Sequence, residues 1–168
     1  RVIRHHKMMQ RSEAEIDTRY FALPSDWAET VRFHVIGDRT YRLELTSLDD
    51  MLQLRQANGN PTGIPTHFAH VGEQLEVYPA PNGTYSVELL YHQKIPALSD
   101  STTTNWLLTA HPDAYLYGAL LQAAPYLDDD QRMQTWSTLY GNAVQGINQE
   151  SQKARYSGAG MRMRINTY

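Results

Sequence analysis

The sequence predicts an α+β fold: a helical bundle built on two long C-terminal helices, with an inserted antiparallel β-hairpin or meander region and an extended C-terminal arm. Three observations predict it. Apolar and polar side chains alternate in short runs through residues 9–98, which is the period of half-buried strands. Residues 99–155 carry apolar side chains at helical spacing, and residues 156–168 begin with glycines that break a helix. Residues 1–8 are assigned to the end of an N-terminal helix or arm.

The β region opens with a predicted hairpin. Residues 31–35 and 41–45 alternate apolar and polar side chains, and a Gly-Asp-Arg turn separates the two runs. Ser47, with Asp50 three residues later, resembles a capping box in which Asp replaces the usual Glu or Gln. This pattern predicts a short helix over residues 47–56.

A longer antiparallel meander is predicted over residues 65–92. Three alternating runs lie in this segment, separated by Gly72-Glu73 and by Asn82-Gly83. An Asn-Gly pair between two alternating runs is a strong indication of a hairpin. The alternation also indicates a sheet with one face in water.

Two helices are predicted to follow. Residues 113–124 are apolar on nearly every side, so a helix there needs protein partners around it. Pro112 suits the first turn of this helix, and Pro125 is expected to end or kink it. The acidic triplet Asp128-Asp129-Asp130 predicts the start of the second helix, because carboxylates complement the positive end of the helix dipole.

The second helix is predicted to be amphipathic, with an apolar stripe and an opposite face that is polar but uncharged. The residues of the stripe are Met133, Trp136, Tyr140, Ala143, Val144 and Ile147. An uncharged polar face is less typical of a bare surface than of a wet contact between subunits.

The C-terminal arm shows a strand pattern with no local partner in the sequence. Three apolar residues at positions 161, 163 and 165 alternate with Arg162, Arg164 and Asn166. Such a strand can add to the sheet edge of another chain. The alternatives are that it pairs with a sheet of its own chain or frays.

Composition excludes several classes of protein. The chain of 168 residues has no cysteine, which excludes a disulfide scaffold, a cysteine-ligated zinc site, an iron–sulfur cluster and a cysteine nucleophile. Its net charge of -3 argues against a dedicated nucleic-acid binder. The charge is unevenly distributed: residues 1–11 and 153–168 carry bases and no acid, whereas residues 43–150 carry twelve acids and three bases. The ends are therefore expected to meet something different from the body, unless they are simply solvated.

The sequence contains no convincing active site. No nucleophile elbow, phosphate-binding loop or HExxH motif is present. The neighbouring His5 and His6 face opposite ways in an extended segment, and so do His67 and His70. Helix capping explains the acidic triplet. We therefore expect no catalytic residue, no metal site and no cofactor. The alternatives from other classes are a cell-wall hydrolase with a carboxylate pair and a DNA-binding module that uses the basic ends.

The order of several motifs resembles one known family. These are YFALPSDWAETVRFHV at residues 20–35, the long stretch LEVYPAPNGTYSVELLYHQKIPALSDSTTTNWLLTAHPDAYLYGALLQAAPYLDDDQRMQTW at residues 75–136, and ARYSGAGMRMR at residues 154–164. Together they resemble the head-to-tail adaptor (connector) proteins of tailed phages, of the tail-tubular-protein-A type that lies beneath the portal. The resemblance covers roughly residues 8 to 164.

The resemblance implies a structural virion protein that is not an enzyme. It implies a ring, typically dodecameric, in the neck between the portal and the tail or nozzle, after assembly in the host cytoplasm. DNA would pass through the lumen without sequence-specific binding, and no membrane would be involved. A head-completion or stopper protein of the neck is the alternative within the same class. Relatives usually begin with further helices, so upstream helices are expected to be missing before Arg1.

Two sets of contact residues follow as expectations. Related adaptors dock a C-terminal arm onto the portal, and the matching residues are Arg155, Tyr156, Met161, Arg162, Met163, Arg164, Ile165 and Tyr168. A ring also needs two different surfaces on each subunit, which the two predicted helices are expected to supply. The residues expected at that subunit interface are Tyr117, Leu121, Trp136 and Tyr140.

Overall fold

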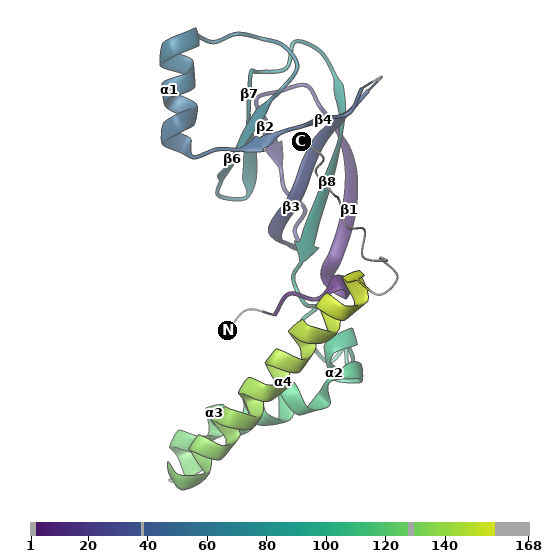
Figure 1. The fold of residues 1–168 in the computed structure, drawn as a ribbon, viewed down its shortest axis with the longest axis vertical. Helices are drawn as coiled ribbons and strands as arrows, with labels where there is room; N and C mark the ends of the chain where they lie inside the picture. The colour runs from purple at the N-terminus through teal and green to yellow at the C-terminus, as the bar shows by residue number, and fades with distance from the viewer. Residues whose placement is uncertain (1–2, 38, 128–129, 157–168) are drawn as a thin grey trace, which may run out of the picture. The chain divides into compact units, whose positions relative to one another are not determined.

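The computed structural model describes residues 3–37, 39–127 and 130–156 (Figure 1). The chain folds into two units. The β unit runs from Met8 to Lys94, and the helical unit combines the residues that precede it with those that follow it. The short 3-10 turn His6–Met8 lies where the chain passes from the helical unit into the β unit.

Eight strands of the β unit form two four-stranded sheets, each of which mixes strands that are distant in sequence. The first sheet has the order β1 (Met9–Ile16), β8 (Tyr85–Gln93), β3 (Trp27–Ile36) and β4 (Tyr41–Arg42), and all its pairs are antiparallel. The second has the order β2 (Tyr20–Ala22), β7 (Gln74–Tyr78), β6 (His67–Val71) and β5 (Glu44–Leu45), and β5 runs parallel to β6.

Both sheets contribute to a single hydrophobic core. Phe33 on β3 has no exposed surface, and its ring meets Phe68 on β6 edge-on at 5.4 Å. This is a favourable geometry for two aromatic rings. The other buried members of the core are Ile16, Val35, Leu43, Leu75, Val77, Val87, Leu89 and Tyr91. Alternation along the strands sends these side chains inward and their polar neighbours outward.

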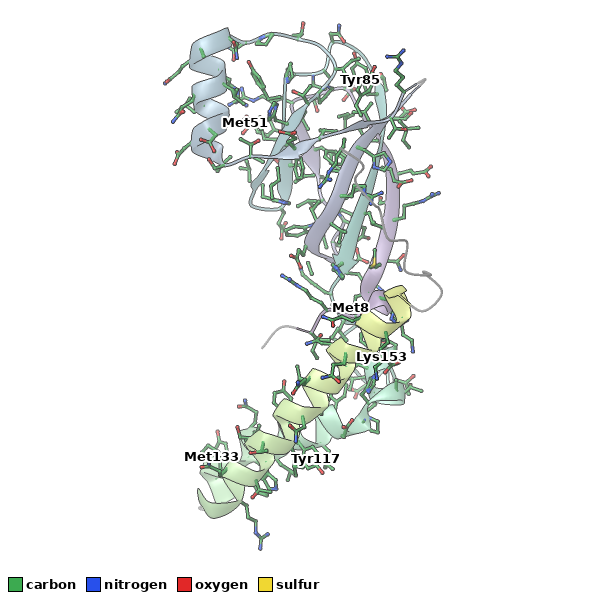
Figure 2. All side chains as sticks on the ribbon, viewed as in Figure 1. Met8, Met51, Tyr85, Tyr117, Met133 and Lys153 are labelled. Atoms are coloured by element: carbon green, nitrogen blue, oxygen red, sulfur yellow. The ribbon has the colours of Figure 1, made fainter. Side chains whose placement is uncertain are left out.

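Helix α1 (Leu48–Asn58) packs on the second sheet through one face. The side chain of Ser47 caps it by accepting a hydrogen bond from the backbone N–H of Asp50 at 3.1 Å. Met51 is fully buried in a small cluster with Ala69 and Tyr78 (Figure 2). A single buried contact of this kind leaves much of the helix in solvent.

A buried carboxylate joins α1 to the second sheet. Glu76 on β7 is almost fully buried and accepts a hydrogen bond from the Nε of Arg19 at 2.6 Å. Its other partner is Arg55 in the last turn of α1, which forms an ion pair with the same carboxylate. Two guanidinium groups therefore compensate one buried negative charge, which would otherwise be costly to desolvate.

The helical unit contains α2 (Trp106–Ala110), α3 (Pro112–Leu127) and α4 (Asp130–Tyr156). Leu107, Ala114 and Ile147 form its buried centre, one from each helix. Ala114 meets Ile147 while Gly118 lies against Tyr140, so α3 and α4 run antiparallel. Within the described residues, no helix combines the length and apolarity that a membrane span requires.

The predicted fold class is wrong in its central feature. The described residues contain four helices and eight strands in two sheets, not a helical bundle with two long helices. Only α4, with 27 residues, is long, whereas α3 has 16. α3 begins at Pro112, where a proline fits the first turn, and it continues past Pro125 to end at Leu127.

The predicted meander over residues 65–92 is also wrong beyond its first hairpin. β6 and β7 pair across a two-residue turn in which Gly72 has φ +61, a conformation that suits glycine. β8, however, pairs with β1 and β3 in the other sheet. Pro79 and Pro81 lie between β7 and β8 and have no N–H to donate to a strand ladder. The Asn82-Gly83 turn therefore connects two sheets.

We predict that Glu76→Gln destabilises the β unit by about 1–3 kcal/mol, because both arginines lose their charged acceptor in a desolvated place. Urea unfolding followed by circular dichroism measures the change. Glu13→Gln is the matched control, because Glu13 pairs with Arg11 on the surface. Equal effects of the two substitutions would contradict the structural role of Glu76.

Candidate interaction surfaces

An apolar groove runs along the helical unit. Its walls are Ile3, the segment 95–98, one face of α3 and Tyr140 of α4. Leu107 of α2 also lines it, so side chains from five separate stretches of the chain line one continuous depression. Such grooves are typical binding places for another protein segment.

Asn105 fixes one wall of this groove. Its side-chain oxygen accepts a hydrogen bond from the backbone N–H of Leu108 at 2.8 Å and so caps α2. Its amide nitrogen donates to the carbonyl of Pro96 at 2.8 Å and to the hydroxyl of Tyr115 at 2.7 Å. One buried side chain therefore ties the 95–98 segment, α2 and α3 together.

Gly118 allows helices α3 and α4 to approach each other closely. A Cβ atom at this position would lie 3.4 Å from the ring of Tyr140, at the limit of ordinary contact. A side chain larger than that of alanine at position 118 would therefore have to displace the ring of Tyr140.

Outside the groove, the helical unit also exposes large apolar side chains. Leu116 on α3 is 55% exposed and Tyr126 is 88% exposed. Leu116 and Gly118 are two residues apart, so they lie on opposite sides of α3, about 200° around the helix. Met133 on α4 is exposed as well (Figure 2). The helical unit thus presents apolar surface on two different sides.

The four residues predicted at the subunit interface all belong to the helical unit. Tyr117 and Leu121 lie on α3, Trp136 and Tyr140 lie on α4, and each is half-buried. Of the four, Tyr140 lines the groove. The exposed Leu116 was not singled out from the sequence, because a helix that is apolar on every side gives no indication of its open face.

The predicted portal-docking arm falls mostly outside the described residues. Arg155 and Tyr156 belong to the last turn of α4. The remaining residues of the predicted arm, from Met161 to Tyr168, are not among those that the structure describes.

The β unit carries a second exposed apolar surface on α1. Leu48 and Leu52 are one helical turn apart and therefore lie on the same side of α1. Both are about half exposed, and Leu45, just before the helix, is more exposed still. Met51, which packs on the sheet, lies next to this surface on α1.

A polar cluster holds the first residues of the chain against α4. The backbone N–H of Arg4 donates to the side-chain oxygen of Asn148 at 3.0 Å, and the N–H of His6 donates to the hydroxyl of Ser151 at 2.9 Å. Between them, His5 is fully buried and stacks on Trp106 with ring centres 4.9 Å apart. Burial lowers the pKa of His5 below its ordinary value, because it disfavours the charged imidazolium.

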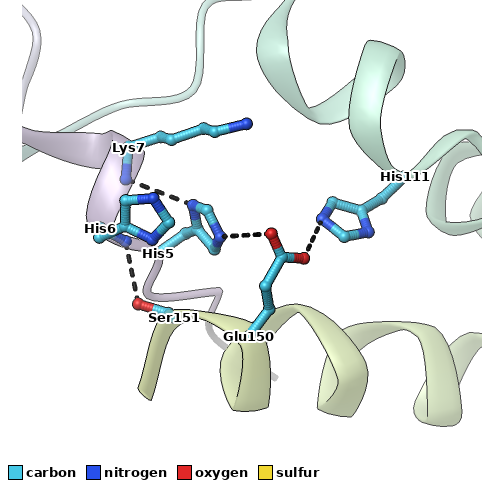
Figure 3. Close-up of polar contacts among 6 residues, drawn as sticks. All are labelled: His5, His6, Lys7, His111, Glu150 and Ser151. Atoms are coloured by element: carbon cyan, nitrogen blue, oxygen red, sulfur yellow. Dashed lines mark hydrogen bonds and ion pairs between the residues drawn. The ribbon is translucent and has the colours of Figure 1, made fainter. Parts of the chain in front are cut away.

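Two histidines face one carboxylate in this cluster. The Nε2 atom of His111 lies 3.2 Å from one oxygen of Glu150, and the Nε2 atom of His5 lies 4.0 Å from the other (Figure 3). The three residues come from the N-terminal segment, the end of α2 and α4. Sequence reasoning compared only histidines that are close in the chain, so it did not find this cluster. No pattern in the sequence predicts that residues so far apart in the chain lie close together.

A family model described as the SU10 adaptor protein matches residues 1–164. The chain belongs to the SU10 adaptor protein family. This confirms the resemblance to phage head-to-tail adaptors that the sequence motifs indicated. A search of curated proteins found no match. Membership of the SU10 adaptor protein family implies a structural, non-enzymatic adaptor role in the neck of a phage particle, with contacts to other virion components such as portal and tail.

We predict that Asn105→Ala lowers the stability of the helical unit by about 1–3 kcal/mol, because α2 loses its cap and the Pro96 carbonyl loses a buried donor. Thermal unfolding followed by circular dichroism measures this. Asn105→Ser is the matched variant: it keeps a capping oxygen but lacks the amide that donates to the Pro96 carbonyl, so its loss should be smaller. A wild-type transition for Asn105→Ala would contradict the role assigned to this residue.

Proposed function

We propose that this chain is the subunit of a dodecameric ring that joins the portal to the tail or nozzle and encloses the path of the DNA. Membership of the adaptor family supports the general role. The observation that carries the ring is the pair of apolar surfaces on opposite sides of α3: the groove and the exposed Leu116 side.

A ring closes only when each subunit offers two different, complementary surfaces. In a head-to-tail contact, one patch of a subunit meets another patch of its neighbour, and a rotation that closes gives a ring. The groove is concave and apolar, whereas Leu116 projects from the other side of α3. We therefore assign the subunit contacts to the helical unit, with Tyr117, Leu121, Trp136 and Tyr140 at or beside them.

An adaptor also needs contacts with components that are not copies of itself. The apolar surface of α1, with Leu48 and Leu52, is available for one of these. We assign the other to the C-terminal arm, which would dock on the portal. The residues proposed for this contact are Arg155, Tyr156, Met161, Arg162, Met163, Arg164, Ile165 and Tyr168.

The uneven charge of the chain suits a passage for DNA. Residues 43–150 carry twelve acids and three bases. An acidic lumen repels the phosphate backbone and leaves the DNA free to slide, since tight backbone binding depends on basic side chains. The basic ends, residues 1–11 and 153–168, would then contact neighbouring proteins.

We predict that Leu116→Glu weakens ring assembly at least tenfold, because it places a charge in an apolar contact. Multi-angle light scattering of the chain, alone and with its portal protein, measures the assembled mass. Leu52→Glu is the matched control, since Leu52 has nearly the same exposure but lies on α1. It should leave the number of subunits in the ring unchanged.

Light scattering also distinguishes the adaptor ring from a stopper protein. A chain without residues 157–168 should stay folded and no longer join the portal. A full chain that stays monomeric and ignores the portal would contradict the adaptor ring and favour a stopper protein elsewhere in the neck. A ring that Leu116→Glu leaves intact would contradict the assignment of the subunit contacts to α3.

A further inference from the structure

We propose that His5, His111 and Glu150 form a binding site for a divalent transition metal, Zn²⁺ in the first place. Each of the three residues offers one ligand atom, and these atoms all lie within 4.8 Å of one another. Two imidazole nitrogens and one carboxylate oxygen are a ligand set that zinc accepts, with a fourth position left open. The sequence alone predicted no metal site, because the three positions are far apart along the chain.

The burial of the imidazole nitrogens indicates a missing partner. The Nε2 atoms of His5 and His111 are both buried, and neither has a hydrogen-bond partner within the described residues. Buried polar atoms are nearly always hydrogen-bonded, so two ring nitrogens that have only the Glu150 carboxylate nearby, at 3.2 Å and 4.0 Å, need a physical explanation. A cation between them would satisfy both nitrogens and balance the negative charge of Glu150.

Zinc binding would require the three ligand atoms, which lie within 4.8 Å of one another, to move closer together. Nitrogen and oxygen ligands about 2.0–2.2 Å from a tetrahedral zinc ion lie about 3.4 Å from one another. The His111 nitrogen and its Glu150 oxygen are already 3.2 Å apart, and the His5 nitrogen is 4.0 Å from the second oxygen. Glu150 is half exposed, so its side chain can move and the open fourth position can reach solvent.

The surroundings of His5 hold its ring in place for this role. Trp106 stacks on one face of the ring, and the backbone bonds of Arg4 and His6 to α4 fix the segment on both sides. The backbone N–H of Lys7 donates to the Nδ1 of His5 at 3.3 Å. A metal on Nε2 would place the imidazole proton on Nδ1 and break this long contact. The Lys7 amide is therefore a reporter of binding.

Such an ion would cross-link three segments of the helical unit: the N-terminal segment, the junction of α2 and α3, and the end of α4 (Figure 3). A ligand that binds only the folded state stabilises it in proportion to the logarithm of its concentration over its dissociation constant. Zinc would thus strengthen the attachment of the N-terminal segment to α4.

The test uses the full 168-residue chain, stripped of metal with a chelator and titrated with Zn²⁺ alone in a calorimeter. We expect one ion per chain, and we expect His111→Gln and Glu150→Gln to weaken binding at least tenfold. His67→Gln is the control, because His67 belongs to the β unit, where it lies on β6 beside Glu44. It should bind as the original chain does.

Two further readouts keep the test decisive. Because Glu150 is half exposed, Glu150→Gln should give the circular dichroism spectrum of the original chain. Zinc should shift the amide resonance of Lys7 in the original chain and not in that variant. Absence of zinc binding, or binding that both ligand substitutions leave unchanged, would overturn the proposal.

Discussion

The attachment of the N-terminal segment to α4 is the constraint on which the rest of the structure depends. Two backbone N–H groups, of Arg4 and His6, donate to the side chains of Asn148 and Ser151 near the end of the chain. Each such bond contributes roughly 0.5–1.5 kcal/mol. The burial of His5 against Trp106 adds apolar contact to them. The helical unit is therefore discontinuous in sequence, and the β unit is inserted into it.

An inserted unit must begin and end at nearby points, and the first sheet meets this requirement. β1 and β8 are the first and last strands of the β unit, and they pair with Met9 opposite His92. The chain can leave the helical unit after Lys7 and return to it at Ile95 without a long connection. Inserting the β unit closes a long loop in the helical unit, which costs conformational entropy. The separate core around Phe33 and Phe68 offsets this cost. Each unit thus holds its own buried centre and its own exposed apolar surface.

Local features of the fold could be predicted from the sequence, and pairings between distant segments could not. Ser47 and Asp50 indicated the start of α1, and the side chain of Ser47 does cap that helix. The alternation around Phe33 indicated β3 and its hairpin with β4. By contrast, the Asn82-Gly83 turn gave no information about which sheet the next strand joins. The parallel pairing of β5 with β6 likewise depends on segments on either side of α1.

The same contrast between local features and distant contacts applies to the candidate site. The motif order along the chain was enough to indicate the family, because it depends only on sequence. The open face of α3 was not predictable, since a helix with apolar residues all round shows no preferred side. The cluster of His5, His111 and Glu150 exists only because the N-terminal segment returns to α4. This cluster could therefore be found only from the three-dimensional structure.

The central claim is that the helical unit carries the contacts between subunits. Hydroxyl-radical footprinting of the free chain and of the chain assembled with its portal tests this most directly, because it labels exposed side chains one by one. We expect that Leu116 becomes protected on assembly, while Tyr20 and Tyr41 of the β unit, which are also exposed, keep their labelling. Protection of Tyr20 and Tyr41 with unchanged labelling of Leu116 would contradict it.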